Sequence, residues 1–196
     1  DVCSSDLNAG TGFSFQNRYE TNVPLKISGS AVCAGQLDNS GTTHLVATDN
    51  YDTGIVDSIV YTIGADYRPT QAATLPVPYF DRNNLTTTEQ SHDVSCRIAD
   101  FNNDGLNDIM IVSALTNAAT ASGAQPATSM AQILINRGGL VFEDITDAVM
   151  ANYPTLTFSS YAPRIIDLNG DGKKDIWLQN DRDGSNQAWI DRKSTR

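Results

Sequence analysis

Two stretches of the sequence repeat one another and decide the fold. Residues 94–112 read V-S-C-R-I-A-D-F-N-N-D-G-L-N-D-I-M-I-V, and residues 161–178 read Y-A-P-R-I-I-D-L-N-G-D-G-K-K-D-I-W-L. A fainter copy is 32–47, V-C-A-G-Q-L-D-N-S-G-T-T-H-L-V-A. Self-similarity of this kind is the sequence signature of a repeat architecture. The copies are aligned by one glycine each, at intervals of 64 and 67 residues: Gly41, Gly105 and Gly172.

Each copy predicts a strand, an acidic turn, a strand, a loop and another strand. Ser58–Gly64, Gln132–Gly138 and Gln187–Ile190 resemble one another and predict one recurring strand, while Phe142–Thr146 predicts an outer strand of the second copy. The only helical segment we expect is one turn at Asp147–Tyr153.

The apolar runs predict strands that are covered on both faces. They are short and rich in β-branched residues, as in Ile59–Ile63, Ile109–Val112 and Ile133–Ile135. A sheet with one wet face would alternate apolar and polar side chains, and these runs do not. Sheets packed radially between neighbouring sheets meet this demand. We therefore predict an all-β fold, a partial β-propeller of about three blades of antiparallel strands.

The acidic turns predict calcium sites. Oxygen-bearing side chains stand at positions 1, 3, 5 and 9 of each full turn, a backbone carbonyl at position 7 could add a ligand, and glycine at position 6 permits a positive φ. Hard oxygens at this density suit Ca²⁺, which takes six to eight ligands. The predicted ligands are Asp100, Asn102, Asp104, Leu106 and Asp108 in the second copy, and Asp167, Asn169, Asp171, Lys173 and Asp175 in the third.

An EF-hand and a metal-free hairpin turn are alternatives to this calcium-binding interpretation of the turns. An EF-hand would need flanking helices and an acid at position 12, where Ile111 and Leu178 stand instead. A metal-free hairpin turn rich in Asp and Asn is the other alternative. The first copy has lost the acids at positions 1 and 9, and its four positions are Gln36, Asp38, Ser40 and His44. We therefore expect weak calcium binding there or none, and we expect His44 to lie on the surface of the turn.

The cysteines and the chain ends bear on domain organisation. Cys33 and Cys96 lie at similar places in successive copies, which favours buried free thiols, with a disulfide as the alternative.

One DNA string and its reverse complement can encode the two ends, and that string resembles a sequencing adaptor. The predicted organisation is adaptor-derived 1–7, a propeller fragment 8–190 with repeat units at about 26–80, 90–147 and 160–190, and adaptor-derived 191–196.

Composition narrows the classes of partner that the chain could bind. The chain has 196 residues, a formal net charge of −10 and no apolar run of the length that a membrane-spanning helix needs. An acidic surface repels phosphate backbones and anionic lipid. We therefore expect no nucleic-acid partner and no membrane insertion.

The repeats resemble the FG-GAP/VCBS family of β-propeller repeats, over about residues 26–190. The strongest matches are D-F-N-N-D-G-L-N-D-I, D-L-N-G-D-G-K-K-D-I and I-L-I-N-R-G-G-L-V-F-E-D-I-T. The resemblance implies calcium held by the ten residues named above, between strands of a blade. The Gly-Ala-Pro signature of integrin-type copies is absent, which favours a bacterial VCBS-like branch. Because three units cannot close a ring, we expect a fragment whose partners include the remaining blades of a longer chain.

This resemblance implies a non-catalytic role in a secreted, cell-surface or periplasmic protein, in adhesion or in binding a glycan or protein ligand. The alternative is a non-catalytic propeller attached to a secreted hydrolase or lyase whose catalytic domain lies outside these residues. Ser91, His92 and Asp93 form a cluster, but neighbours on a strand point to opposite faces, so we expect no enzyme here. The long loop Ala114–Ser129 is a candidate recognition surface.

Overall fold

The computed structural model describes residues 31–48, 57–64, 68–77, 90–116, 129–149, 160–180 and 187–189, with the side chains of 90–94, 114–116, 129–130, 160–162, 180, 187 and 189 left aside. These residues form three antiparallel sheets and one short helix, α2 (Thr146–Val149). The predicted all-β class is confirmed.

The strands follow one another in each sheet in chain order. The first sheet consists of β1 (Val32–Gly35), β2 (His44–Ala47), β3 (Ile59–Ile63) and β4 (Pro69–Thr74). The second consists of β5 (Gln90–Ala99), β6 (Asp108–Thr116), β7 (Ser129–Asn136) and β8 (Phe142–Asp144). The third consists of β9 (Ser160–Ile166), β10 (Asp175–Asn180) and β11 (Gln187–Trp189).

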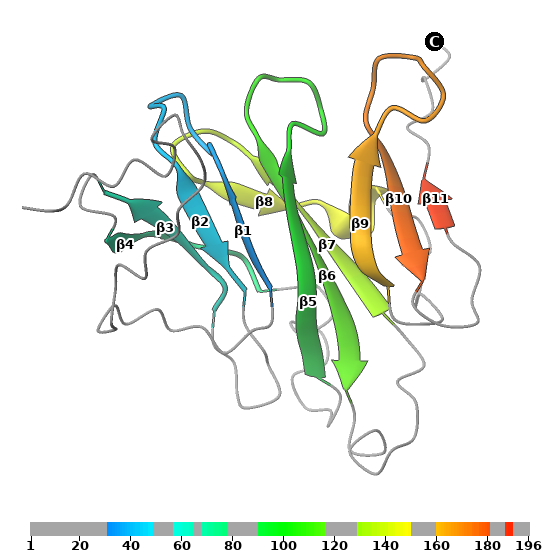
Figure 1. The fold of residues 1–196 in the computed structure, drawn as a ribbon, viewed down its shortest axis with the longest axis horizontal. Coiled ribbons are helices and arrows are strands. Elements are labelled where there is room, and N and C mark those ends of the chain that lie inside the picture. Colours follow the sequence, from blue (N-terminus) through cyan, green and yellow to red (C-terminus); the bar gives the residue numbers. More distant parts are fainter. Residues whose placement is uncertain are drawn as a thin grey trace, which may run out of the picture.

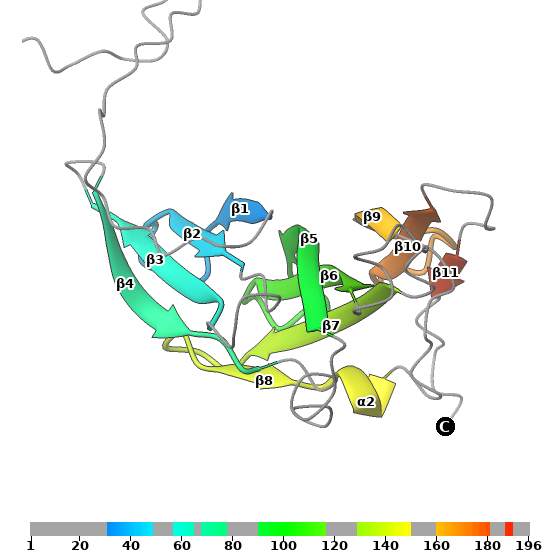
Figure 2. The same ribbon diagram turned by 90° about the horizontal axis from the view of Figure 1, so that it is seen from below.

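The sheets stand side by side like blades (Figure 1). Seen from below, the first strand of each sheet, β1, β5 or β9, lies on one side of the molecule, and the outer strands β4 and β8 lie on the other (Figure 2). β5 contacts both β1 and β9. This radial arrangement confirms the partial β-propeller.

Strand β6 shows why the apolar runs do not alternate. Ile109 and Ile111 belong to a core cluster shared with the first sheet, which includes Val46 and Val60. Met110 and Val112 belong to a second cluster that includes Leu178 of the third sheet. All four β6 side chains are fully buried, so the prediction that this strand is covered on both faces is confirmed.

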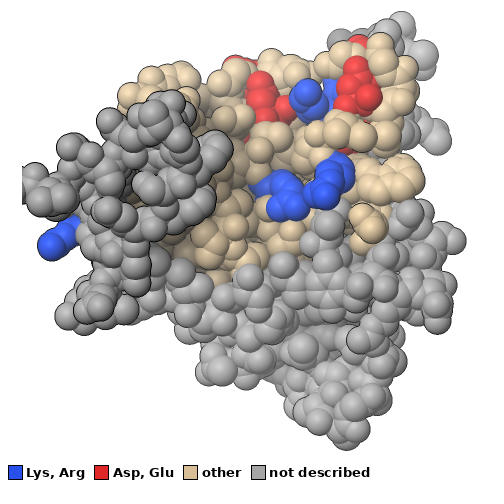
Figure 3. Space-filling model, viewed as in Figure 1, with Lys and Arg blue, Asp and Glu red and all other residues tan. Residues whose placement is uncertain are grey.

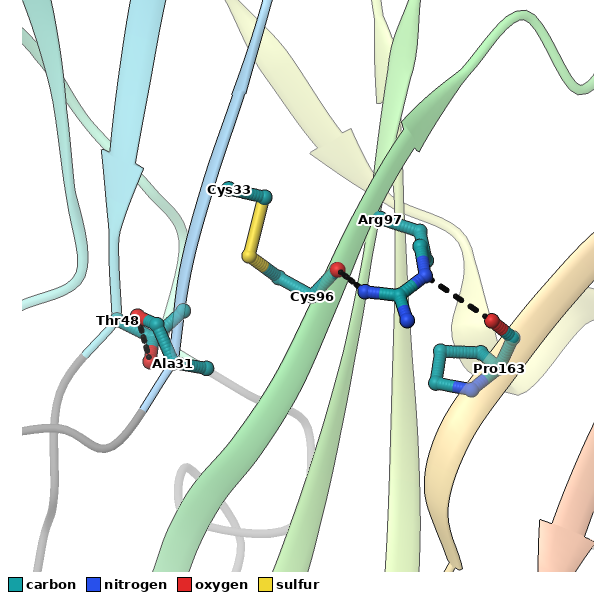
Figure 4. Close-up of a disulfide and its surroundings, with 6 residues drawn as sticks. All are labelled: Ala31, Cys33, Thr48, Cys96, Arg97 and Pro163. Atoms are coloured by element: carbon teal, nitrogen blue, oxygen red, sulfur yellow. Dashed lines mark hydrogen bonds between the residues drawn. A yellow bond between two sulfur atoms is a disulfide. The ribbon is translucent and has the colours of Figure 1, made fainter. Parts of the chain in front are cut away.

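The inner strands are tied together by adjacent residues of β5 (Figure 4). Cys96 forms a disulfide with Cys33 of β1, and their Cα atoms are 5.8 Å apart. The Nε of Arg97 donates to the carbonyl oxygen of Pro163 in β9 at 3.1 Å, and its Nη1 donates to the Cys96 carbonyl oxygen at 2.7 Å. The predicted free thiols are therefore wrong: similar positions on neighbouring blades bring the two sulfur atoms together.

Replacing Arg97 by methionine should lower the free energy of unfolding by about 1–3 kcal/mol, because the apolar stem stays while a charged donor to two carbonyl groups is lost. Urea unfolding measures this change. Arg164→Met is the matched control, since Arg164 holds the same repeat position on β9 and is exposed, and it should change stability by less than about 0.5 kcal/mol. Equal losses in the two variants would contradict the role given to Arg97.

Several boundaries differ from the predicted ones. Strand β6 extends to Thr116 and β7 begins at Ser129, so the predicted loop Ala114–Ser129 is shorter at both ends, and 117–128 lie outside the described residues. Strand β4 was not predicted, although it closes the first sheet as β8 closes the second. Helix α2 starts one residue before the predicted turn. No helix in the described parts of the chain is long and apolar enough to cross a membrane.

Some sequence-based expectations concern residues without a structural description. Both predicted adaptor-derived ends, 1–7 and 191–196, lie outside the described residues, as do 150–153 of the predicted helical turn and Ile190. The side chains of Ser91, His92 and Asp93 are likewise outside them.

Candidate calcium-binding turns

Three turns join the first two strands of the three sheets, and they lie at the same end of the blades (Figure 1). We call them turn 1 (36–44), turn 2 (100–108) and turn 3 (167–175). The acidic side chains of turns 2 and 3 form two separate patches on the face shown in Figure 3. The glycine at position 6 has a positive φ in every turn, at 79° for Gly41, 88° for Gly105 and 86° for Gly172, as the repeat pattern predicts.

In turn 2 the side chains at positions 1, 3 and 5 fold inward onto backbone amides. The two carboxylate oxygens of Asp100 accept from the N–H groups of Asp104 at 3.1 Å and Gly105 at 3.0 Å. The Oδ1 of Asn102 accepts from the Asp104 N–H at 3.0 Å, and the Oδ1 of Asp104 accepts from the Leu106 N–H at 2.8 Å. The hydrogen bond from Leu106 and that from the Asn102 side chain lower the pKa of Asp104.

Turn 3 repeats this arrangement in its own residues. The Oδ1 of Asp167 accepts from the Asp171 N–H at 3.1 Å, and its Oδ2 accepts from the Gly172 N–H at 2.8 Å. The Oδ1 of Asn169 accepts from the Asp171 N–H at 3.0 Å, and the Oδ1 of Asp171 accepts from the Lys173 N–H at 3.0 Å. The amide of Gly172 is the main cause of the lowered pKa of Asp167. The two turns are therefore copies in geometry as well as in sequence.

Position 9 differs from the other side-chain positions of the turn because it is buried in the blade. Asp108 and Asp175 are fully buried. The two oxygens of Asp108 accept from the Phe101 N–H at 2.8 Å and the Asn136 N–H at 2.9 Å, and Asp175 accepts from the Leu168 N–H at 2.8 Å. Burial raises the pKa of Asp108 against these hydrogen bonds. Position 9 thus fastens the turn to its blade.

The donor set of each turn fits a hard cation in its chemistry. Two carboxylates and an amide oxygen surround the amides of positions 5–7 in turns 2 and 3, and each such oxygen has a second lone pair beyond the one that accepts from the backbone. The carboxylates themselves are not gathered: among the described residues, no three His, Cys, Asp or Glu side chains lie together as a metal site. Leu106 and Lys173, whose carbonyl groups are predicted ligands, donate N–H groups to Asp104 and Asp171.

Turn 1 has replaced the buried carboxylate by an imidazole. His44 is fully buried, and its Nδ1 accepts from the Leu37 N–H at 3.3 Å, at the position where Asp108 and Asp175 accept in the other turns. The Oδ1 of Asp38 accepts from the Ser40 N–H at 3.0 Å. The expected surface histidine is therefore wrong, because position 9 of the repeat points into the blade.

Sequence reasoning missed two asparagines that connect turn 2 to turn 1. The Nδ2 of Asn107 donates to the Gln36 carbonyl oxygen at 2.7 Å, and the Nδ2 of Asn136 donates to the Leu37 carbonyl oxygen at 2.6 Å.

Sequence reasoning also missed the positive φ at position 4 of turns 2 and 3: Asn103 has a φ of 59° and Gly170 a φ of 76°. Asn and Gly are the residues that adopt this conformation at lowest cost, which was the available signal.

Radial antiparallel blades, each with an Asx-rich turn between its first two strands, define a β-propeller-type repeat domain. Residues 100–178 match the family model described as FG-GAP-like repeat. The match spans turns 2 and 3 and confirms the resemblance there. No curated protein shows significant similarity to the chain.

Proposed function

We propose that this chain is a calcium-stabilised β-propeller segment, in which turns 2 and 3 each bind one Ca²⁺. The observation that carries the proposal is that two turns of the pattern D-x-N-x-D-G-x-x-D fold alike and direct their side-chain oxygens inward. The residues that would hold the ion are those at positions 1, 3, 5, 7 and 9. When bound, the ion neutralises carboxylates that otherwise repel one another.

The role of the ion is structural in this proposal. Each turn joins the innermost strand of a blade to the next, so a cation that links positions 1 to 9 holds the ends of β5 and β6, or of β9 and β10, at a fixed distance. The protein supplies the buried carboxylate at position 9 as the anchor of the turn to the blade. Calcium is hard, oxygen-seeking and tolerant of irregular geometry, which suits such a turn.

We also propose a non-catalytic role outside the cytosol, in adhesion or in binding a glycan or protein ligand. The Cys33–Cys96 disulfide supports this location, since disulfides persist in secreted, cell-surface and periplasmic proteins. Extracellular calcium is abundant enough to fill sites of modest affinity. Retention of the protein on immobilised glycans, compared with and without calcium, tests the ligand-binding part.

Calcium titration tests the metal proposal. Calorimetry should find two ions per chain, and free calcium at about one hundred times Kd should add about 2.7 kcal/mol of stability per site. The double variant Asp104→Ala plus Asp171→Ala should lose both the binding and the thermal shift. Asp147→Ala, an exposed acid outside the turns, should keep them. An unchanged melting temperature in wild type on adding either calcium or a chelator would refute the proposal.

A further inference from the structure

Two side-chain donors of the second sheet and its turn 2 hold turn 1. Asn107, at position 8 of turn 2, donates its amide N–H to the Gln36 carbonyl oxygen at 2.7 Å. Asn136, at the end of β7, donates to the Leu37 carbonyl oxygen at 2.6 Å. The first two residues of turn 1 are therefore fixed by the neighbouring blade.

Asn136 is also attached to turn 2. Its backbone N–H donates to Oδ1 of Asp108 at 2.9 Å, and its Nδ2 also donates to the Asn107 carbonyl oxygen at 3.0 Å. Asn136 and Asp108 are fully buried, and Leu37 is nearly so. Buried hydrogen bonds of this kind are costly to leave unmade, so the position of Asp108 is linked to the position of Leu37.

Turn 1 has the imidazole of His44 in place of the buried carboxylate of turns 2 and 3. The Nδ1 of His44 accepts from the Leu37 N–H, so the proton of the neutral imidazole lies on Nε2. A metal on Nε2 would require the proton on Nδ1, where the Leu37 N–H already points. Nε2 is buried, has no hydrogen-bond partner among the described residues, and lies 3.7 Å from the Asp38 carboxylate.

We propose that calcium in turn 2 orders turn 1 of the neighbouring blade, with Asn107 and Asn136 as the positioning residues that connect the two turns. The inference rests on the proposed calcium function. Binding pulls positions 1 to 9 of turn 2 together, and both Asn107 and the Asp108–Asn136 contact move with them. The cation of one blade thereby fixes the backbone carbonyl groups that begin the turn of the next.

Hydrogen exchange of the full chain tests the coupling. Calcium should slow the exchange of turn 1 amides, Leu37 to Thr43, by about tenfold, the size expected when one or two hydrogen bonds are secured. Asn107→Ala should remove most of this slowing while calorimetry still finds two bound ions. Lys174→Ala is the matched control: it changes position 8 of turn 3, and Figure 1 shows turn 2 standing between turn 3 and turn 1, so it should leave turn 1 unaffected.

The outcomes separate the two proposals. Calcium that binds to turn 2 without slowing exchange in turn 1 overturns the coupling alone. If calcium slows hydrogen exchange in turn 1 equally in wild type, Asn107→Ala and Asn136→Ser, the role of the asparagines is overturned, and this inference with it. If calorimetry finds no bound calcium, both this coupling and the proposed function fall.

Discussion

Replacing Asp108 by alanine is expected to lower the free energy of unfolding by about 2–6 kcal/mol, because two backbone donors lose their acceptor and each costs about 1–3 kcal/mol when buried unpaired. Asp108 is fully buried, and its oxygens accept from the Phe101 and Asn136 amides. The loss should be present in calcium-free buffer, since these contacts are internal to the protein. Urea unfolding with a chelator present measures it.

The matched control is Asp104→Ala in the same buffer. Asp104 belongs to the same turn but is exposed, so without calcium its replacement should change stability by less than about 0.5 kcal/mol. Adding calcium should then separate wild type from Asp104→Ala. Equal losses for the two variants without calcium would show that position 9 is an ordinary surface residue of the turn rather than its anchor.

Reduction of the Cys33–Cys96 disulfide is expected to cost about 4 kcal/mol, from the entropy that a closed loop of this length removes from the unfolded chain. The two cysteines are 63 residues apart and belong to different blades. Denaturant unfolding with and without a reducing agent measures the change. The double variant Cys33→Ala plus Cys96→Ala should be insensitive to the reducing agent. A wild-type midpoint that does not move on reduction would contradict a bond between these blades.

Much of the fold could be predicted because its signals are local. Apolar runs such as Ile109–Val112 report that both faces of a strand are covered, and the structure has β6 between two core clusters. The positive φ of Gly105 and Gly172 was also predictable, because it is required by the nine residues of the turn alone. Strand β4 was not predicted because Pro69–Thr74 is largely exposed and carries little apolar patterning.

The candidate site was predictable in its membership but not in its arrangement. The repeated spacing identifies positions 1, 3, 5 and 9 as one group, and the inward hydrogen bonds of Asp100 and Asp104 agree with that grouping. Burial separates Asp108 from the others. A sequence pattern treats its four acidic or amide positions alike, whereas the packing of β6 against β7 decides which carboxylate is taken from water.

By itself, the sequence determined most strands of the blades, the turns between their first two strands and the residues that carry oxygen there, because the signal for each lies within a short stretch of the chain. Only the tertiary structure decided that Cys33 pairs with Cys96, that His44 is buried, and that Asn136 reaches the carbonyl group of Leu37, 99 residues away. Such contacts depend on how one sheet is placed against the next. That placement results from the packing of whole sheet faces, which no single repeat of the sequence contains.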